Sequence, residues 1–164
     1  MAITYPIFSN KIEVDLRHPS SFFRRKARPV KLTLIRGVPG SGKSTFAKKY
    51  AIANGHIKIV EFDDFWIDKN KTYKFIPEIK MACVEYGRSA VTHELIIEKR
   101  PCIITGVFNK LEYIEYFKNL CEMFNIPLEV IKMTGNFQNI HNVPEDVLKT
   151  MKEEFEDFEG EILK

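Results

Sequence analysis

The sequence of 164 residues lacks the features that mark a membrane protein or a disulfide-stabilised secreted protein. It has no apolar run close to the roughly 18 residues that a membrane-spanning helix needs. Residues 1–6 lack the charged segment followed by an apolar stretch that marks a secretory signal. The three cysteines, Cys83, Cys102 and Cys121, match no zinc-binding or redox pattern. We therefore expect a cytoplasmic protein with no membrane partner, whose cysteines are reduced and mostly buried.

The composition that remains is that of one globular domain with an uneven charge distribution. Apolar residues make up 45% of the chain and charged residues 29%. Residues 1–31 hold seven Lys or Arg against two acidic residues, whereas residues 141–164 hold three Lys against eight acidic residues. We expect residues 1–29 to be a basic N-terminal extension and residues 30–164 to be the folded domain. The extension is either a solvated arm or a contact for nucleic acid.

Apolar runs alternate along the chain with amphipathic segments. Such alternation is typical of an α/β fold, with a parallel sheet of about four to five strands and helices on both faces. Strands are predicted at residues 12–16, 31–36, 57–62, 101–105 and 128–133. Helices are predicted at residues 44–53, 77–99 and 111–124, and from Pro144 along an apolar stripe that reaches Ile162.

The long helix predicted at 77–99 has an apolar face that we expect to be buried. Gly87 interrupts the segment and is a weak position within a helix. The residues near the apolar face are Ile79, Ala82, Cys83, Tyr86, Ala90 and Leu95.

Residues 37–45 read Gly-Val-Pro-Gly-Ser-Gly-Lys-Ser-Thr and contain the complete pattern G-x-x-x-x-G-K-[ST]. The glycines let the backbone curl so that its N–H groups point at phosphate oxygens, and the following helix adds its positive end. In this pattern Lys43 neutralises the outer phosphates, and the Ser44 hydroxyl ligates Mg²⁺. The predicted nucleotide-binding residues are Gly37, Pro39, Gly40, Ser41, Gly42, Lys43, Ser44 and Thr45.

The pattern lies between a predicted strand and a predicted helix, which is the context that phosphate binding requires. It therefore predicts the P-loop NTPase/kinase fold. The guanine-reading motif Asn-Lys-x-Asp is absent from the sequence, so the expected nucleotide is ATP, bound with Mg²⁺. The loop alone does not distinguish a kinase from an ATPase.

Two acidic residues, Asp63 and Asp64, follow the strand predicted at 57–62. A carboxylate there is expected to face the phosphate loop across the crevice between neighbouring strands. It could accept a proton from a hydroxyl that attacks the γ-phosphate, or it could hold Mg²⁺ through water. We predict Asp63 and Lys43 as catalytic residues, and Asp64 with Ser44 as metal ligands. Alternatively, the two acids cap the next turn.

The chain from about Leu32 to Phe155 resembles the small P-loop kinases of the polynucleotide 5′-hydroxyl kinase type, among the AAA/zeta-like ATP-binding kinases. The resemblance implies that Asp63 is the general base for a 5′-hydroxyl, and that a short lid lies around residues 134–142. It also implies ATP-dependent phosphoryl transfer, most plausibly to the 5′ end of a nucleic acid. The resemblance is carried by the phosphate loop, by Asp63-Asp64-Phe65-Trp66, and by Asn142-Val143-Pro144 with Leu148 and Met151.

The sequence departs from that family at three places. Thr105 stands where an acidic residue is usual, and Trp66 where an arginine often grips the acceptor. The lid region has no arginine, and Lys132 is the nearest fixed cation. The alternatives are a slow kinase, a kinase that takes a cation from elsewhere such as Arg88, and a module that binds ATP without chemistry. A kinase for a nucleoside or small metabolite is a further alternative.

Overall fold

The chain forms a five-stranded parallel sheet, seen in a computed structural model that describes residues 2–5, 12–15, 28–62, 76–137 and 143–164. The strands lie in the order β4-β5-β3-β6-β7, and each neighbouring pair is parallel. This arrangement confirms the predicted α/β fold and its number of strands. The strands are β3 (Leu32–Arg36), β4 (Lys58–Glu61), β5 (Cys102–Gly106), β6 (Leu128–Lys132) and β7 (Ile162–Leu163).

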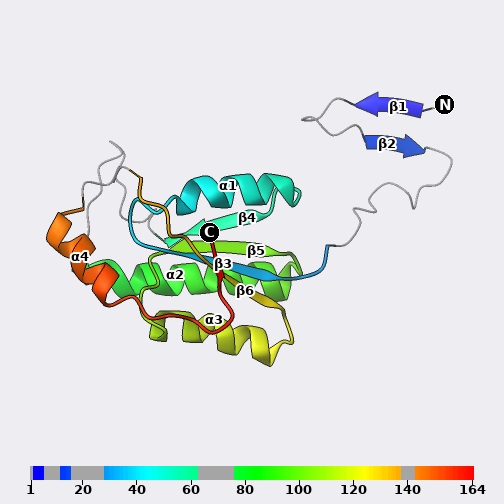
Figure 1. The fold of residues 1–164 in the computed structure, drawn as a ribbon. Coiled ribbons are helices and arrows are strands. Elements are labelled where there is room, and N and C mark those ends of the chain that lie inside the picture. The colour runs from blue at the N-terminus through cyan, green and yellow to red at the C-terminus, as the bar shows by residue number, and fades with distance from the viewer. Residues whose placement is uncertain (1, 6–11, 16–27, 63–75, 138–142) are drawn as a thin grey trace.

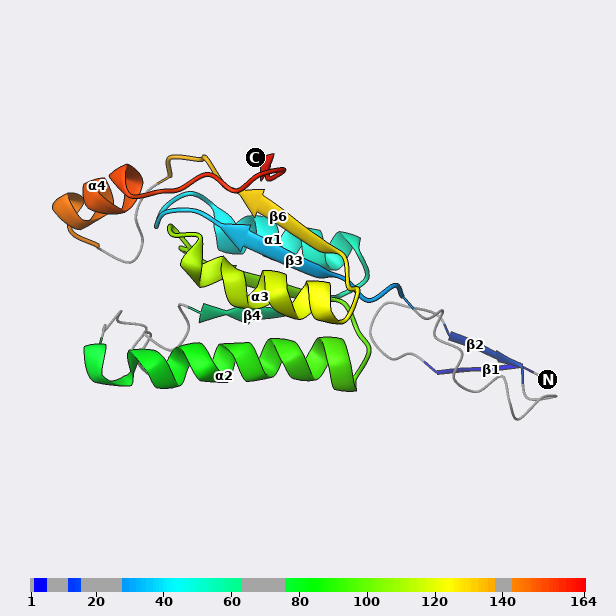
Figure 2. The same ribbon diagram turned by 90° about the horizontal axis from the view of Figure 1, so that it is seen from below.

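Helices cover both faces of this sheet, as predicted (Figures 1 and 2). Helix α1 (Lys43–Ala53) lies on one face, and α2 (Lys80–Thr92) and α3 (Glu112–Met123) lie on the other. Helix α4 (Glu145–Glu153) lies beyond the edge at which the strands end. None of the helices that the structure describes is long and apolar enough to cross a bilayer.

The central strand, β3, is buried along its whole length because both of its faces carry apolar side chains. Leu32 and Leu34 belong to the core that includes residues of α2 and α3, and Ile35 packs with Ala47 and Ala51 of α1. Burial on both faces is typical of strands in parallel sheets that helices cover from two sides. The loop after β3 therefore begins at the edge where ligands bind in such sheets.

The N-terminal residues contain two short strands, β1 (Ala2–Tyr5) and β2 (Ile12–Asp15), which pair in antiparallel fashion as a separate two-stranded sheet. The alternating pattern predicted β2, whereas its partner β1 was not predicted. The assignment of residues 1–29 to a basic extension outside the kinase domain remains a prediction.

The helix predicted at 77–99 is present as three consecutive segments, η3 (Pro77–Ile79), α2 and η4 (His93–Ile97). The prediction of the buried face is partly wrong, because Ile79, Ala82 and Tyr86 are exposed, Tyr86 to 63%. The buried residues of α2 and η4 are Cys83, Gly87, Val91, Glu94 and Leu95.

Gly87 and Glu94 explain why the hydrophobic pattern did not predict the buried face of this helix. A Cβ atom at Gly87 would overlap the ring of Phe62, so glycine allows α2 and the end of β4 to approach closely. Glu94 is only 2% exposed, because its carboxylate accepts hydrogen bonds from Lys58 (2.8 Å) and Arg100 (3.0 Å). Neither residue contributes to an apolar periodicity, although both lie on the buried side of the helix.

The last helix is shorter than predicted, since α4 ends at Glu153 and Ile162 lies in β7. The segment between them makes tertiary contacts instead of continuing the helix: the Glu156 N–H donates to the Asn109 carbonyl (2.8 Å), and Phe158 packs against the core. Apolar residues at helical spacing occur here by chance, because each contacts a different part of the domain.

The three cysteines are buried and unpaired, as predicted. Burial raises the pKa of the Cys102 thiol to about 12 and that of Cys121 to about 11. Both thiols are therefore protonated at neutral pH and are poor nucleophiles.

We expect Glu94→Gln to destabilise the domain by about 1.5–3 kcal/mol at pH 7, the range for hydrogen bonds to charged groups. Burial alone would raise the pKa of Glu94, but hydrogen bonds and charge from Lys58 and Arg100 hold it below its ordinary value. Because the pKa of Glu94 is lower in the folded state, the ionised carboxylate stabilises the fold at pH values above the unfolded pKa of about 4.3. This contribution is lost as the pH falls through the lower pKa of the folded state. Urea unfolding at pH 7 and in a series below pH 4 measures this difference.

The matched control is Glu98→Gln, which removes an exposed carboxylate that lies 3.4 Å from the same Arg100. It should cost less than about 0.5 kcal/mol, as surface substitutions usually do. Equal costs for the two variants, or a cost at Glu94 that does not shrink in acid, would show that the buried ion pairs do not provide this stability.

Candidate nucleotide site

The loop between β3 and α1 has the curled backbone that a phosphate-binding loop needs. Gly40 and Gly42 have φ angles of 80° and 91°, in the left-handed region that favours glycine. A Cβ atom at Gly37 would lie 2.5 Å from the Ser41 hydroxyl oxygen and 2.8 Å from the Met133 carbonyl oxygen. The predicted glycine positions are therefore required by the close approach of the backbone.

The interior of this loop offers polar groups to an anion. Helix α1 begins at Lys43 directly after Gly42, and no side chain of the described residues caps its N-terminus. The Ser41 hydroxyl is buried and has no hydrogen-bond partner among the residues that the structure describes. Backbone N–H groups at a helix N-terminus together with an unsatisfied hydroxyl fit the phosphates of a nucleotide.

Lys43 and Ser44 lie where the phosphate pattern requires them. The Lys43 side chain is 7% exposed, and its Nζ atom donates a hydrogen bond to the Val38 carbonyl (3.0 Å) across the loop. Ser44 and Thr45 are in the first turn of α1, and Pro39 lies within the loop. All the predicted nucleotide-binding residues therefore lie in the loop and the first turn of α1, and the role of Ser44 as a Mg²⁺ ligand remains a prediction.

Asp63 and Asp64 lie outside the described residues, but the residue before them is firmly placed. The Phe62 ring packs edge-to-face against Phe108 (5.4 Å between ring centroids) and Phe117 (6.1 Å). These contacts and the glycine at position 87 fix the end of β4. Strand β4 therefore ends at the edge of the sheet from which the phosphate loop also begins.

The predicted crevice between neighbouring strands is wrong in one respect, because β5 lies between β4 and β3. The residue beside the start of the phosphate loop is Val107, whose carbonyl accepts a hydrogen bond from the Gly37 N–H (3.3 Å). Strand order depends on long-range packing, so the local pattern that predicted each strand could not predict its neighbour.

The first residues of the predicted lid lie directly on the phosphate loop. The Phe137 N–H donates to the Gly40 carbonyl (2.8 Å), and a Cβ atom at Gly42 would lie 3.0 Å from the Phe137 ring. The lid residues 138–142 lie outside the described part of the chain. Phe137 was not predicted as a site residue, although it is the one aromatic residue within a polar stretch.

The buried Arg36 at the end of β3 connects the start of the phosphate loop to the C-terminal segment through hydrogen bonds and an ion pair. Arg36 is fully buried and its guanidinium contacts the Glu161 carboxylate (3.3 Å) and the Glu156 carbonyl (2.7 Å). It also lies 4.4 Å from the centroid of the Phe155 ring. Burial lowers the pKa of Arg36, and the Glu161 carboxylate opposes this shift. Sequence reasoning missed this network, because its members are separated by more than a hundred residues.

A cavity of about 260 Å³ opens beside the phosphate loop and extends to α4. It is lined by Val38 of the loop, by the end of β6 with the residues after it, and by two residues at the C-terminal end of α4 and just beyond. The lining residues are Val38, Lys132, Met133, Thr134, Gly135, Asn136, Lys152 and Phe155.

Arg88, which the sequence offered as a source of positive charge, is directed elsewhere. Its guanidinium donates to Glu85 (2.8 Å) and stacks on the Tyr116 ring of α3 (4.6 Å to the centroid). It therefore joins α2 to α3 on the face opposite α1 and does not contact the phosphate loop.

No family model matches the chain, but its fold is shared by solved kinase structures. A sugar kinase from Janibacter sp. HTCC2649 aligns over 83% of this chain and 84% of its own, with 20% identity and a TM-score of 0.57. A gluconokinase from Sinorhizobium meliloti 1021 aligns over 82% and 81%, with 18% identity and a TM-score of 0.53.

A chain from the Pnkp1/Rnl/Hen1 RNA repair complex aligns over 80% of this chain with 17% identity and a TM-score of 0.61. The match covers 46% of that chain, so this protein spans less than half of its length. These similarities confirm the predicted P-loop kinase fold, which a chain of this RNA repair complex shares with the two kinases.

Proposed function

We propose that the protein is an ATP-dependent kinase that transfers the γ-phosphoryl group of ATP to a hydroxyl group. The observation that carries this proposal is the complete phosphate loop, with its open helix N-terminus and unsatisfied Ser41 hydroxyl, at the strand ends of a kinase fold. Kinase and ATPase loops share this geometry. The similarity to kinase folds supports an acceptor other than water by analogy of fold.

Each proposed residue has a separate task in this reaction. The loop N–H groups and Lys43 hold the phosphates of ATP, and Ser44 with Asp64 would hold Mg²⁺. Bound Mg²⁺ neutralises charge on the phosphate oxygens. Asp63, which follows Phe62 in the sequence, accepts the proton of the attacking hydroxyl.

The acceptor that we favour is the 5′-hydroxyl of a nucleic acid. The support is the resemblance of Asp63-Asp64 and of Asn142-Val143-Pro144 to the polynucleotide kinases, together with the basic N-terminal residues. Among those basic residues, Arg28 donates to the Gly55 carbonyl and Lys31 pairs with Glu129 (3.0 Å). Arg24, Arg25 and Lys26 are therefore the proposed phosphate contacts.

A small polyol or sugar is the second candidate acceptor. The sugar kinase and the gluconokinase each match over more than 80% of both chains, whereas the RNA repair chain is matched over less than half of its own length. This sequence has Trp66 after the acidic pair, where the polynucleotide kinases often have an arginine that binds the acceptor. The absence of that arginine also favours an acceptor that carries no phosphate group.

A competition between acceptor classes tests the proposal. Radiolabelled ATP would be supplied with a 5′-hydroxyl oligonucleotide, a nucleoside, or gluconate and sugars, at low and moderate salt. Label in the oligonucleotide that decreases with salt, and with Arg24, Arg25 and Lys26 replaced by alanine, would support the nucleic-acid acceptor, because polyanion binding releases counterions. Label only in a small acceptor would exclude the nucleic acid and retain the kinase.

We expect Asp63→Asn to reduce transfer by about 10²-fold or more, the usual contribution of a general base. ATP binding should stay nearly unchanged, because the phosphate loop provides it. The measurement is kcat alongside the ATP-dependent rise in Tm. Loss of ATP binding in proportion to turnover would instead assign Asp63 to Mg²⁺ binding or to structure, and full activity would remove it from the mechanism.

A further inference from the structure

We infer that Lys152 is a further catalytic residue, whose ammonium group contacts the phosphoryl group during its transfer. This inference rests on the proposed kinase function and adds a residue that neither the phosphate loop nor the acidic pair provides. It starts from the cavity beside the loop, which Lys152 of α4 and Val38 of the loop both line. The cavity therefore joins α4 to the place where the phosphates bind.

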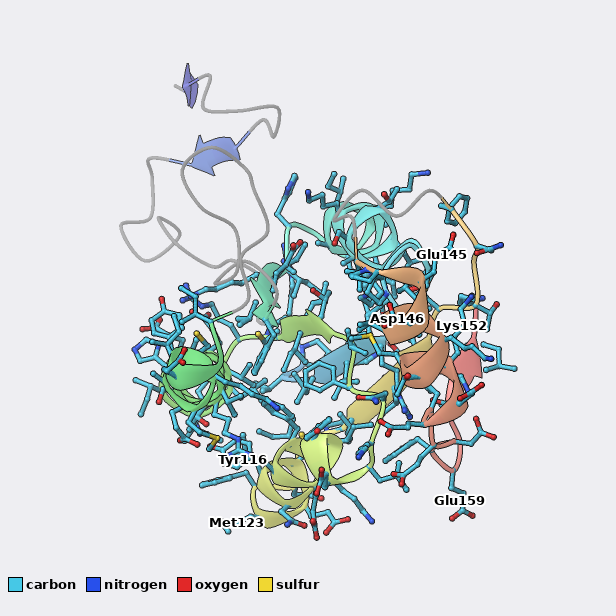
Figure 3. All side chains as sticks on the ribbon, turned by 90° about the vertical axis from the view of Figure 1, so that its left-hand side faces the viewer. Tyr116, Met123, Glu145, Asp146, Lys152 and Glu159 are labelled. Atoms are coloured by element: carbon cyan, nitrogen blue, oxygen red, sulfur yellow. The ribbon has the colours of Figure 1, made fainter. Side chains whose placement is uncertain are left out.

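Helix α4, which carries this lysine, lies at the edge of the sheet where the strands end and the phosphate loop begins. Figure 3 looks at the molecule from the side where the strands end, and there α4, with Lys152 labelled, lies in front of the strand ends. The helix has no buried residue of its own, so its role is not to fill the core. The chain continues from α4 to Phe155, whose ring lies against Arg36 just before the phosphate loop.

Other cations near the cavity are already engaged. The Lys132 ammonium is paired with Asp157 and lies 3.7 Å from the Glu161 carboxylate, so its charge is neutralised locally. Lys149, on the same helix, lies 3.9 Å from the Glu153 carboxylate. In contrast, Lys152 forms no ion pair within the ranges that the structure describes.

The acidic residues that surround Lys152 in sequence have other partners. Glu153 lies beside Lys149, Glu154 lies 3.8 Å from Lys110, and Glu156 accepts a hydrogen bond from the Leu111 N–H (2.6 Å). Lys152 is therefore the lysine of α4 that lines the cavity, while the acids next to it in sequence contact Lys149 and the residues just before α3.

Phosphoryl transfer explains why such a cation is useful. The bond between the γ-phosphorus and the bridging oxygen breaks, and its electron pair leaves with ADP. A new bond forms between the acceptor oxygen and the phosphorus, and the hydroxyl proton passes to the proposed base Asp63. The phosphoryl oxygens carry negative charge throughout, so a cation that contacts them only during transfer accelerates the reaction. The arginine-free lid leaves this role to another residue.

The test compares two substitutions of Lys152 with one control substitution of Lys149, which lies on the same helix. Lys152→Met keeps most of the length of the side chain and removes its charge, and Lys152→Arg keeps the charge. Lys149→Met removes a lysine of the same helix that does not line the cavity. We expect Lys152→Met to lower kcat by about 10²–10³-fold, as for loss of one group that stabilises a transition state. Lys152→Arg should retain most of the activity, and Lys149→Met should match the wild type.

Two further readouts separate catalysis from structure and from acceptor binding. ADP with aluminium fluoride mimics the transferring phosphoryl group, so its affinity should fall in Lys152→Met while the affinity for ADP alone stays unchanged. A rise in acceptor KM with unchanged kcat would overturn the inference, because Lys152 would then hold the acceptor. An equal loss in Lys149→Met would also overturn it.

The proposed function and this inference fail in different ways. A wild-type protein that binds ATP but transfers phosphate neither to any acceptor nor to water would overturn the kinase and the role of Lys152 together. A wild-type protein that transfers phosphate, with Lys152→Met equally active, would overturn the role of Lys152 alone.

Discussion

Replacing Lys43 by alanine is expected to reduce phosphoryl transfer by at least about 10²–10³-fold, the cost of losing one charge-stabilising group, and to remove most of the stabilisation by ATP. Lys43 is the first residue of α1, and its ammonium donates a hydrogen bond to the Val38 carbonyl of the loop (3.0 Å). Bound ATP would replace that carbonyl with phosphate oxygens, which carry more negative charge. Alanine removes the cation and leaves the glycine geometry of the loop intact.

The measurement is the rise in Tm with Mg²⁺ and ATP, followed by kcat for each protein. Lys48→Ala is a suitable control, because Lys48 is an exposed residue of the same helix. It should show the wild-type shift and wild-type turnover. An unchanged Tm shift in Lys43→Ala would place the nucleotide at another site.

Replacing Arg36 by methionine is expected to lower the free energy of unfolding by about 3–5 kcal/mol, the usual cost of breaking a buried ion pair. Glu161 has a side chain that is only 6% exposed, and it would lose the closer of its two cations. The bonds to the Glu156 and Asn109 carbonyls would also disappear. For a chain of this length, the loss corresponds to a decrease in Tm of roughly 6–20 °C.

A double substitution distinguishes the ion pair from simple packing. Arg36→Met combined with Glu161→Leu should recover much of the lost stability, since apolar residues can replace a buried ion pair at little cost. Thermal unfolding of the single and double variants completes the cycle. If the double variant is less stable than Arg36→Met, then Glu161 contributes through its other cation, Lys132, and not through Arg36.

The phosphate loop could be predicted in full because its chemistry is local. Nine consecutive residues contain the glycines, the lysine and the serine, and the flanking strand and helix are recognisable from neighbouring residues. The strand β3 was equally predictable, because Leu32, Leu34 and Ile35 form an apolar segment directly before the loop. In both cases the information lies within a few residues of the feature.

Features that depend on distant contacts could not be predicted in this way. The buried face of α2 is set by the approach of Phe62 to Gly87 and by the ion pairs of Glu94, neither of which is apolar periodicity. The segment after Glu153 leaves the helix because β7 pairs with β6 and because Arg36 binds the Glu156 carbonyl. The cavity that Lys152 lines is formed by the same long-range contacts.

The most direct measurement of the central claim is ³¹P nuclear magnetic resonance of ATP, Mg²⁺ and a mixture of hydroxyl acceptors incubated with the protein. We expect a phosphomonoester signal that grows in equal amount with ADP and is absent with Lys43→Ala. Formation of ADP with inorganic phosphate alone would identify an ATPase, and unchanged ATP in the presence of bound nucleotide would identify a binding module. Either result would contradict the account of the protein as a kinase.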